Sequence, residues 1–254
     1  MAGHSKWANI QHRKGRVDAA RGKLWSKLSK KIIVAAKTGG GDPDANFTLR
    51  KAIDDAKAVS MPKDNINRAI KSGTGELAGG DLEESIYEGY GPGGVAIMCE
   101  SLTDNRNRTG PEIKTIFKKL GGDLGKNGCV SYLFDRKGVF AFDASADEES
   151  LTMVALEHGG EDIQPPEPSD DPEESGEFQV TCPVEAFSSL SDAFAEAEMT
   201  PVRSGLQWVP QMMVDLDGDT AGKVLRLLEQ LDDHDDIQSV STNANITDEA
   251  MAEG

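Results

Sequence analysis

The hydrophobic period of this chain changes between Gly75 and Glu84, and that change separates two kinds of fold. Before it, apolar residues recur every three or four positions, which is the period of helices that bury one stripe. After it, short apolar runs typical of strands alternate with helical segments. The stretch between them is rich in glycine and acid, which predicts a linker. The sequence therefore predicts an α+β protein that begins with a helical domain.

Three helices are predicted before the linker, at residues 17–37, 42–58 and 62–73. A run of three glycines ends the first, and Asp42 followed by a proline is predicted to cap the second. Their apolar positions predict one small shared core, into which Trp25 is expected to pack. The residues expected on the buried faces are Val17, Ala20, Leu24, Leu28, Ile32, Ala35, Leu49, Ala52, Ile53, Ala56, Ile66, Ala69 and Ile70.

Two α/β domains are predicted after the helical domain (1–75), one inserted into the other. The inserted domain, residues 135–209, has the element order β-α-β-β-α-β of the ferredoxin-like fold. The flanking segments, 85–134 and 210–246, each predict a strand, a helix and a strand, and together they complete one sheet. Strands are expected at 94–102, 129–134, 138–142, near Ile163, and at 177–182, 205–209, 211–216 and 237–242. Helices are expected at 109–120, 147–158, 184–197 and 219–231, and a solvated acidic loop at 165–177.

The charge of the chain divides near the same place. Residues 1–72 hold 16 Lys and Arg against 6 Asp and Glu, a net charge of +10. The remaining residues hold 11 and 38, a net charge of −27, so the whole chain carries −17. A basic segment on so acidic a chain indicates a polyanionic partner, for which nucleic acid is the natural candidate. The alternative is a solvated basic surface with no partner.

Four groups of residues are predicted to contact that partner. The start of the chain mixes basic, polar and aromatic residues, which suits phosphate contacts and stacking on a base. Lysines at helical spacing share one face of the first helix, and two cations lie on the third. The fourth group is a pair of arginines in the stretch TDNRNRTG. The predicted contact residues are Lys6, Trp7, Arg13, Lys14, Arg16, Lys23, Lys27, Lys30, Arg68, Lys71, Arg106 and Arg108.

The arginine pair lies just before a predicted helix N-terminus. Thr109 and Glu112 have the spacing of a capping box that would open this helix. Backbone N–H groups at such an end favour an anion, so a phosphate fits beside the arginines. The alternative is that one arginine pairs with a carboxylate of the acidic body. Lys118, Lys119 and Lys126 follow close by in the sequence.

No catalytic, metal or cofactor site is predicted. The glycines of GYGPGG (89–94) precede a strand, whereas a dinucleotide fingerprint follows one and opens a helix. The four histidines lack metal-ligand spacing, and the three cysteines form no C-x-x-C motif, as is typical of reduced thiols. No apolar run approaches the ~18 residues that span a membrane, and no secretory signal is present. We therefore expect a cytoplasmic protein that is not an enzyme and has neither cofactor nor membrane partner.

Several motifs resemble one known family. They are MAGHSKWANIQHRKG at the start, AAKTGGGDPDAN (35–46), NRAIKSGTG (67–75), YEGYGPGG (87–94) and LTDNRNRT (102–109). Together they closely resemble the YebC/PmpR family over residues 1–140. GCVSYLF (128–134) is similar to a strand of that family, with changes at Cys129 and Ser131, and Phe47 stands where a proline is usual. None of these changes removes a charge.

This resemblance implies a three-domain α+β protein that regulates gene expression in the cytoplasm without catalysis. Members of the family carry two functional descriptions. One is a DNA-binding transcriptional regulator, for which the second and third helices could form a helix-turn-helix-like pair. The other is a translation factor that binds ribosomal RNA and eases elongation through proline-rich stretches, similar to the mitochondrial activator of cytochrome oxidase subunit synthesis. Nothing in the sequence announces a dimer, which favours a monomer.

Overall fold

The computed structural model describes residues 18–77, 81–166 and 176–246. Within these ranges the chain divides into two compact units, one formed by the described residues before 134 and after 211, and the other by the described residues from 134 to 211. The first unit combines the N-terminal helices with a mixed sheet-and-helix region, and the second is a separate sheet covered by helices. Both units mix helix and sheet, so the α+β class predicted from the sequence is confirmed.

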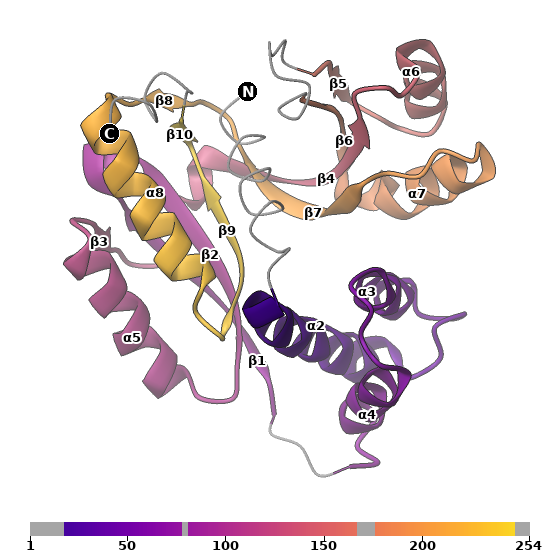
Figure 1. Ribbon diagram of the computed structural model, residues 1–254, viewed down its shortest axis with the longest axis horizontal. Helices are drawn as coiled ribbons and strands as arrows, with labels where there is room; N and C mark the ends of the chain where they lie inside the picture. Colours follow the sequence, from indigo (N-terminus) through magenta and orange to yellow (C-terminus); the bar gives the residue numbers. More distant parts are fainter. Residues whose placement is uncertain (1–17, 78–80, 167–175, 247–254) are drawn as a thin grey trace. The chain divides into compact units, whose positions relative to one another are not determined.

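Three helices form the N-terminal bundle: α2 (Asp18–Gly39), α3 (Phe47–Ala58) and α4 (Lys63–Gly73) (Figure 1). Trp25 packs against their core as predicted, and its indole nitrogen donates to the Val59 carbonyl at 3.2 Å. No helix in the described ranges is both long and apolar enough to cross a membrane. The buried core consists of Leu28, Ile32, Ala35, Ala36, Leu49, Ala52, Ile53, Ala56, Met61, Ile66 and Ala69.

The second helix starts later than predicted, because Asn46 caps it in place of Asp42. The Asn46 side chain accepts a hydrogen bond from the Leu49 amide at 3.1 Å. Its own amide nitrogen donates to the carbonyls of Ala35 and Gly40 at 2.8 and 2.9 Å. One buried side chain thus satisfies the end of α2 and the start of α3 together. Asp42 instead accepts from the backbone within a short turn.

A four-stranded antiparallel sheet, in the order β3-β1-β2-β9, carries the second core of this unit. Helices α5 (Arg106–Lys119) and α8 (Gly218–Asp232) lie side by side over one face of it (Figure 1). The strands are β1 (Glu83–Tyr90), β2 (Ala96–Thr103), β3 (Asp123–Leu124) and β9 (Ile237–Thr242). The core between sheet and helices contains Val95, Ile97, Cys99, Ile113, Phe117, Val224, Leu227, Leu228, Leu231, Ile237 and Val240.

Buried Glu88 explains why most of the strand predicted at 129–134 does not form. Residues 129–133 form a turn and a 3-10 segment, η2 (Ser131–Leu133), and only Phe134 belongs to a strand. The strand at 83–90 was not predicted. Glu88 accepts hydrogen bonds from three backbone amides between residues 128 and 131, at 2.7 to 2.9 Å. Because a side chain satisfies these amides, the segment does not need to pair with a strand.

Helix α5 begins earlier than predicted, at Arg106, because Asn105 is its cap. The Asn105 side chain accepts from the Arg108 amide at 3.2 Å. The capping box of Thr109 and Glu112 is therefore wrong: Thr109 lies inside the helix, fully buried, and its hydroxyl donates to the Asp236 carboxylate at 2.8 Å.

Two short connections complete the first unit. After β1 ends at Tyr90, residues 91–94 form a turn that leads into β2 through η1 (Pro92–Gly94), so these glycines precede a strand as predicted. The segment 211–216 contributes only β8 (Val214–Asp215), which pairs in parallel with β10 (Ala244–Asn245). The prediction that 211–216 adds a strand to the larger sheet is wrong.

The second unit has the predicted ferredoxin-like element order, with antiparallel strands in the order β5-β6-β4-β7. Phe140 stacks on Phe187 with ring centroids 4.8 Å apart, and Phe142 meets Phe194 edge to face, so an aromatic core joins sheet and helix. Residues 167–175 of the expected acidic loop lie outside the described residues. The elements are β4 (Phe134–Asp143), α6 (Glu148–Glu157), β5 (Asp162–Gln164), β6 (Glu177–Pro183), η4 (Val184–Ala186), α7 (Phe187–Glu196) and β7 (Arg203–Pro210).

Candidate nucleic-acid interface

The lysine face of α2 contacts an acidic segment of its own chain. We use the name acidic segment for residues 232–236, Asp-Asp-His-Asp-Asp, which connect α8 to β9. Three lysines donate to backbone carbonyl oxygens of this segment: Lys23 Nζ lies 3.2 Å from the Asp233 carbonyl oxygen, Lys27 Nζ 2.5 Å from that of Asp232, and Lys30 Nζ 3.0 Å from that of Asp235. A fourth lysine on the same face, Lys37, pairs instead with Asp81 at 2.8 Å.

Two of these lysines stabilise a helix end that lacks cations of its own. The carbonyl end of a helix carries a partial negative charge, so basic residues are favoured in its last turn. The last turn of α8 contains no basic residue, and carboxylates follow it directly. Lys27 and Lys23 donate to the carbonyl oxygens of Asp232 and Asp233 at this end and supply the missing positive charge from α2.

Asp236 is the most buried charge in this contact, with a side chain only 4% exposed. One carboxylate oxygen accepts from Lys30 at 2.6 Å, and the other accepts from Arg108 and Thr109, each at 2.8 Å. Burial acts to raise the pKa of this carboxyl, but the hydrogen bonds from Lys30, Arg108 and Thr109 outweigh it and hold the pKa well below its usual range. Ionised Asp236 therefore ties α2 and α5 to the start of β9.

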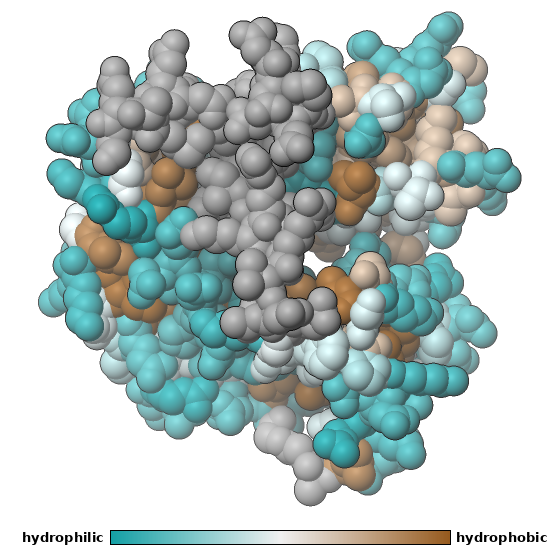
Figure 2. Space-filling view, in the orientation of Figure 1, coloured by the Kyte–Doolittle hydropathy of each residue, from teal (hydrophilic) through white to brown (hydrophobic). Residues whose placement is uncertain are grey.

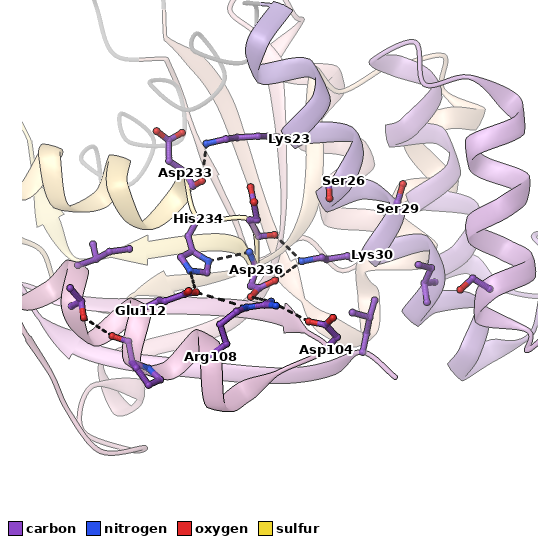
Figure 3. A pocket seen from close by; sticks show the side chains of 17 residues that line it. Lys23, Ser26, Ser29, Lys30, Asp104, Arg108, Glu112, Asp233, His234 and Asp236 are labelled. Carbon is purple, nitrogen blue, oxygen red and sulfur yellow. Dashed lines mark hydrogen bonds and ion pairs between the residues drawn. The ribbon is translucent and has the colours of Figure 1, made fainter. Parts of the chain in front are cut away.

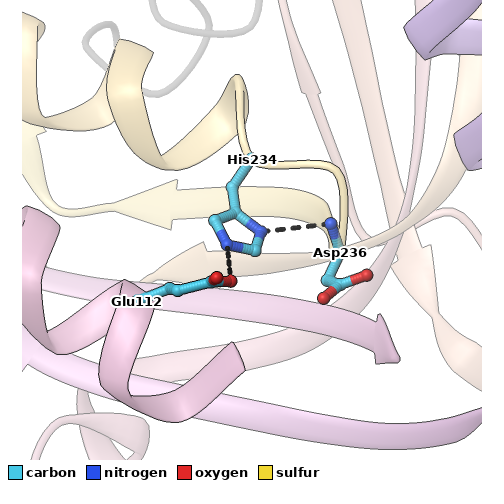
Figure 4. A group of neighbouring side chains, drawn as sticks. All are labelled: Glu112, His234 and Asp236. Atoms are coloured by element: carbon cyan, nitrogen blue, oxygen red, sulfur yellow. Dashed lines mark hydrogen bonds and ion pairs between the residues drawn. The ribbon is translucent and has the colours of Figure 1, made fainter. Parts of the chain in front are cut away.

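Glu112, His234 and Asp236 have the spacing of a cation site, with ligand atoms within 4.8 Å of one another (Figure 4). Their hydrogen bonds point to another role. His234 Nδ1 accepts from the Asp236 amide at 3.1 Å, so Nε2 carries the proton and donates to Glu112 at 3.1 Å. Lys30 and Arg108 also place two positive charges on Asp236, which oppose a bound cation. The three residues form a hydrogen-bond chain that orients the acidic segment.

The two arginines before α5 have different surroundings. Arg108 donates to buried Asp236 and lies 3.1 Å from Asp104. The alternative prediction, that one arginine pairs with a carboxylate of the acidic body, therefore holds for Arg108. Arg106 has a side chain that is 57% exposed, with Glu83 3.8 Å away. Contact of either arginine with nucleic acid stays a prediction, and the structure leaves Arg106 the more accessible of the two.

Helix α4 presents cations that no carboxylate of the described structure holds. Arg68 and Lys71 lie one turn apart and are exposed, and within the described ranges neither has a carboxylate partner. Beside Arg68 a cleft of about 450 Å³ runs between α2 and α4, with the amide of Asn65 and the hydroxyls of Ser29 and Ser72 in its lining. The surface over α3 and α4 is largely hydrophilic (Figure 2). Guanidinium, ammonium, amide and hydroxyl groups are the ones that contact nucleic-acid phosphates.

A second basic face lies on α5. Lys114, which the sequence analysis did not single out, lies one turn before Lys118, and both are exposed. Lys119 and Lys126 are also exposed, and in the part of the chain that is described none of the four has a carboxylate partner. Lys114 could have been found from the sequence, because Lys114 lies four residues before Lys118 in a predicted helix. Its neighbour Ile113 is buried.

A larger cleft, of about 1160 Å³, runs between α2 and α5 (Figure 3). Ser26 and Ser29 of α2 line it on one side. Lys30, Arg108 and Asp236 meet within it, so the opposite charges there already satisfy one another. The cleft offers hydrogen-bonding groups and does not concentrate one sign of charge.

The structure brings together only part of the predicted set. Lys23, Lys27, Lys30 and Arg108 gather at the acidic segment, whereas Arg68 and Lys71 form a separate face on α4. The N-terminal group lies outside the described residues, and its role stays a prediction. That group comprises Lys6, Trp7, Arg13, Lys14 and Arg16.

Comparison with known proteins places the chain among its relatives. A family model described as the TACO1/YebC protein N-terminal domain matches residues 5–76, and one described as the TACO1/YebC second and third domain matches residues 82–244. The chain belongs to the TACO1/YebC family. A TACO1/YebC relative from Rhodopirellula baltica is 65% identical over 253 residues, covering 100% of both chains. Another, from Maridesulfovibrio salexigens, is 53% identical and covers 100% of this chain and 99% of its own. Both are named "probable transcriptional regulatory protein".

The TACO1/YebC fold is also seen in a crystal structure. A conserved hypothetical protein from Aquifex aeolicus is similar to this chain with a TM-score of 0.83 and 44% sequence identity. The similarity covers 93% of this chain and 95% of the other. The predicted resemblance to this family is therefore confirmed over nearly the whole chain, beyond the residues that carried it.

Proposed function

We propose that this protein is a nucleic-acid-binding regulator of gene expression, with DNA-binding regulation of transcription as its first form. One observation carries the proposal: exposed Arg68 and Lys71 on α4 lack carboxylate partners among the described residues, on a segment whose net charge is +10. The name that the two relatives share, probable transcriptional regulatory protein, agrees with a role in gene expression.

The charge of the rest of the chain sets the orientation of binding. The residues after 72 carry a net charge of −27, so they repel the polyanion that the basic segment attracts. Phosphate contacts from Arg68 and Lys71 release counterions and supply affinity without reading sequence. Asn65 and Asn67, exposed on the same helix, offer amide groups that can contact base edges.

Ribosomal RNA is a second candidate partner, and the distribution of exposed cations favours it. Basic side chains without a carboxylate partner among the described residues lie on α5 as well as on α4, so the charge is spread over two separate helices of the first unit. A folded RNA presents many phosphates at different angles and suits such a spread surface. Binding to it would make the protein a translation factor that acts on the ribosome.

The test is a salt titration of binding by wild type and two charge-matched variants. Arg68→Gln with Lys71→Gln removes two exposed cations of α4 and leaves Lys63 in place. Lys51→Gln with Lys57→Gln removes the same charge from α3, where both lysines pair with aspartates of their own helix. If each α4 cation neutralises one phosphate, the slope of log K against log salt falls by roughly 1.4 to 1.8 units in the first variant. We expect a smaller change in the α3 variant, and equal slopes in both would contradict the proposal.

Two probes separate the two forms of the proposal. Promoter-containing duplex DNA is measured by gel shift, and ribosomes are measured by co-sedimentation at the same salt concentration. Binding of the ribosome with weak, sequence-independent DNA binding supports the translation factor. Tight binding of particular promoter fragments supports the transcriptional regulator.

A further inference from the structure

We infer that the Asp232–Asp233 end of the acidic segment is an internal competitor of nucleic acid for Lys23 and Lys27 of α2. In the structure these lysines are held by the chain itself, and a polyphosphate backbone must take them from the C-terminus of α8. The inference rests on the proposed function, because it describes how access to the basic surface is regulated.

The contacts have the chemistry of phosphate binding. Lys27 donates to the carbonyl oxygen of Asp232 at 2.5 Å and lies 3.3 Å from its carboxylate, and Lys23 donates to the Asp233 carbonyl at 3.2 Å. Phosphate oxygens accept hydrogen bonds from lysine in the same way, and a nucleic acid presents them in a row. The acidic segment thus offers these two lysines two backbone carbonyl oxygens and one carboxylate oxygen in place of a phosphate backbone.

The contact is built so that it can exchange. The side chain of Asp232 is 32% exposed, and ion pairs that solvent reaches contribute little to stability. Lysine has a long flexible side chain and three rotatable donors, so Lys23 and Lys27 can turn to a phosphate without movement of α2. The last turn of α8 would then lose the cations that stabilise it.

The other end of the acidic segment is anchored. Asp236 holds Lys30 and Arg108 from a site that is almost fully buried, and His234 is hydrogen-bonded to Glu112. Exchange is therefore confined to the exposed end, and the helical bundle stays joined to the sheet through Lys30 while nucleic acid binds. Lys30 is therefore a structural lysine, whereas Lys23 and Lys27 are available to a partner.

The test compares two aspartates at opposite ends of α8. Asp232→Asn weakens the competitor, whereas Asp219→Asn removes an equal charge in the first turn, about 20 Å away along the helix. The probes are fluorescent random-sequence duplex DNA and, in a separate arm, purified ribosomal RNA, both with the full-length chain. We expect Asp232→Asn to bind about two- to fivefold more tightly than wild type, as loss of a partly buried ion pair that solvent still reaches predicts. Asp219→Asn is expected to bind like wild type.

Hydrogen exchange gives a second measurement that needs no variant. On saturation of the wild type with the probe, amides of the last turn of α8 are expected to exchange faster, because the lysines leave its carbonyl groups. Unchanged exchange, or equal affinities of the two aspartate variants, overturns the inference and leaves the proposed function standing. Failure of the wild type to bind either probe removes the proposed function and the inference together. Circular dichroism confirms that both variants are folded.

Discussion

Helices α2 and α4 belong to one bundle and both carry basic faces, yet the chain uses the two faces differently. Four lysines of α2 donate to the acidic segment or to Asp81, whereas Arg68 and Lys71 of α4 have no carboxylate partner among the described residues. The net charge of the segment, +10, does not distinguish them. A count of positive residues therefore overstates the number of phosphates that the free protein can contact, because part of the charge is already neutralised.

The difference also explains why the acidic body stays attached to a basic domain. Lys30 reaches a carboxylate that burial makes difficult to leave unpaired, and Arg108 approaches the same carboxylate from α5. The paired face holds the unit together and the unpaired face is available to a partner. The predictions below test this division through the stability of the fold.

The largest effect is expected for Asp236→Ala. The substitution leaves Lys30 and Arg108 without their shared carboxylate, and Thr109 without its acceptor, in a buried site. We expect the free energy of unfolding to fall by about 3 kcal/mol, the lower end of the range for buried pairs, since solvent reaches Arg108. Urea denaturation measures this loss of stability, and Asp235→Ala, which changes an exposed aspartate, is the control. Equal stability of the two variants would show that the pairing does not hold the unit together.

The two arginines before α5 should separate in the same measurement. Arg108→Ala removes one partner of Asp236 but leaves Lys30 in place, so we expect a smaller loss of stability than for Asp236→Ala. Arg106→Ala changes an exposed side chain and should alter the free energy of unfolding by no more than about 0.5 kcal/mol. If the two arginine variants are equally stable, Arg108 has no structural role and both side chains are available to a partner.

The pH dependence of stability tests the charge state of Asp236. Its pKa is depressed in the folded protein, so its contribution is fully present above the pKa of the unfolded chain, near 3.9, and is lost as pH falls toward the folded value. Below about pH 4 this group alone can contribute a slope of up to about 1.4 kcal/mol per pH unit. Urea melts of wild type and Asp236→Asn between pH 3 and pH 6 should show a shallower slope in the variant. Parallel slopes would assign the acid sensitivity to other carboxyl groups.

The smallest effect compares one lysine from each face. Lys27→Gln removes a partly buried ion pair and should lower the free energy of unfolding by about 0.2 to 1 kcal/mol, an effect that high salt reduces. Lys71→Gln removes an exposed cation without a carboxylate partner in the described structure, and should leave stability unchanged. Thermal melts at low and high salt measure both. A salt-dependent loss of stability in Lys71→Gln would show that Lys71 has an ion-pair partner within the chain, and would contradict the difference between the two faces.

Much of the fold follows from local pattern. Helical spacing located α2 and α4, the alternation of strands and helices located the ferredoxin-like unit, and Trp25 packs into the bundle as expected. Three of the wrong predictions depend on single polar side chains. Asn46 and Asn105 cap their helices in place of the predicted residues, and Glu88 accepts hydrogen bonds from amides that a strand would otherwise have paired.

The candidate site was less predictable than the fold. Helical spacing correctly placed Lys23, Lys27 and Lys30 on one face of a helix, but it did not predict which segment of the chain lies against that face. The acidic segment is some 205 residues away in sequence. A signal was present, since a run of acids directly after a helix is unfavourable unless a cation lies nearby. The sequence does not say which cation it is.

The sequence by itself determined the helical bundle, the class of the fold, the family and the concentration of positive charge in residues 1–72, because each depends on local periodicity, short motifs or composition. Only the tertiary structure decided which of those charges are free. An ammonium group pairs with whatever oxygen lies within about 3 Å, and that distance is set by packing between segments far apart in the chain. The same residue type is therefore a structural anchor at Lys30 and an exposed cation at Lys71.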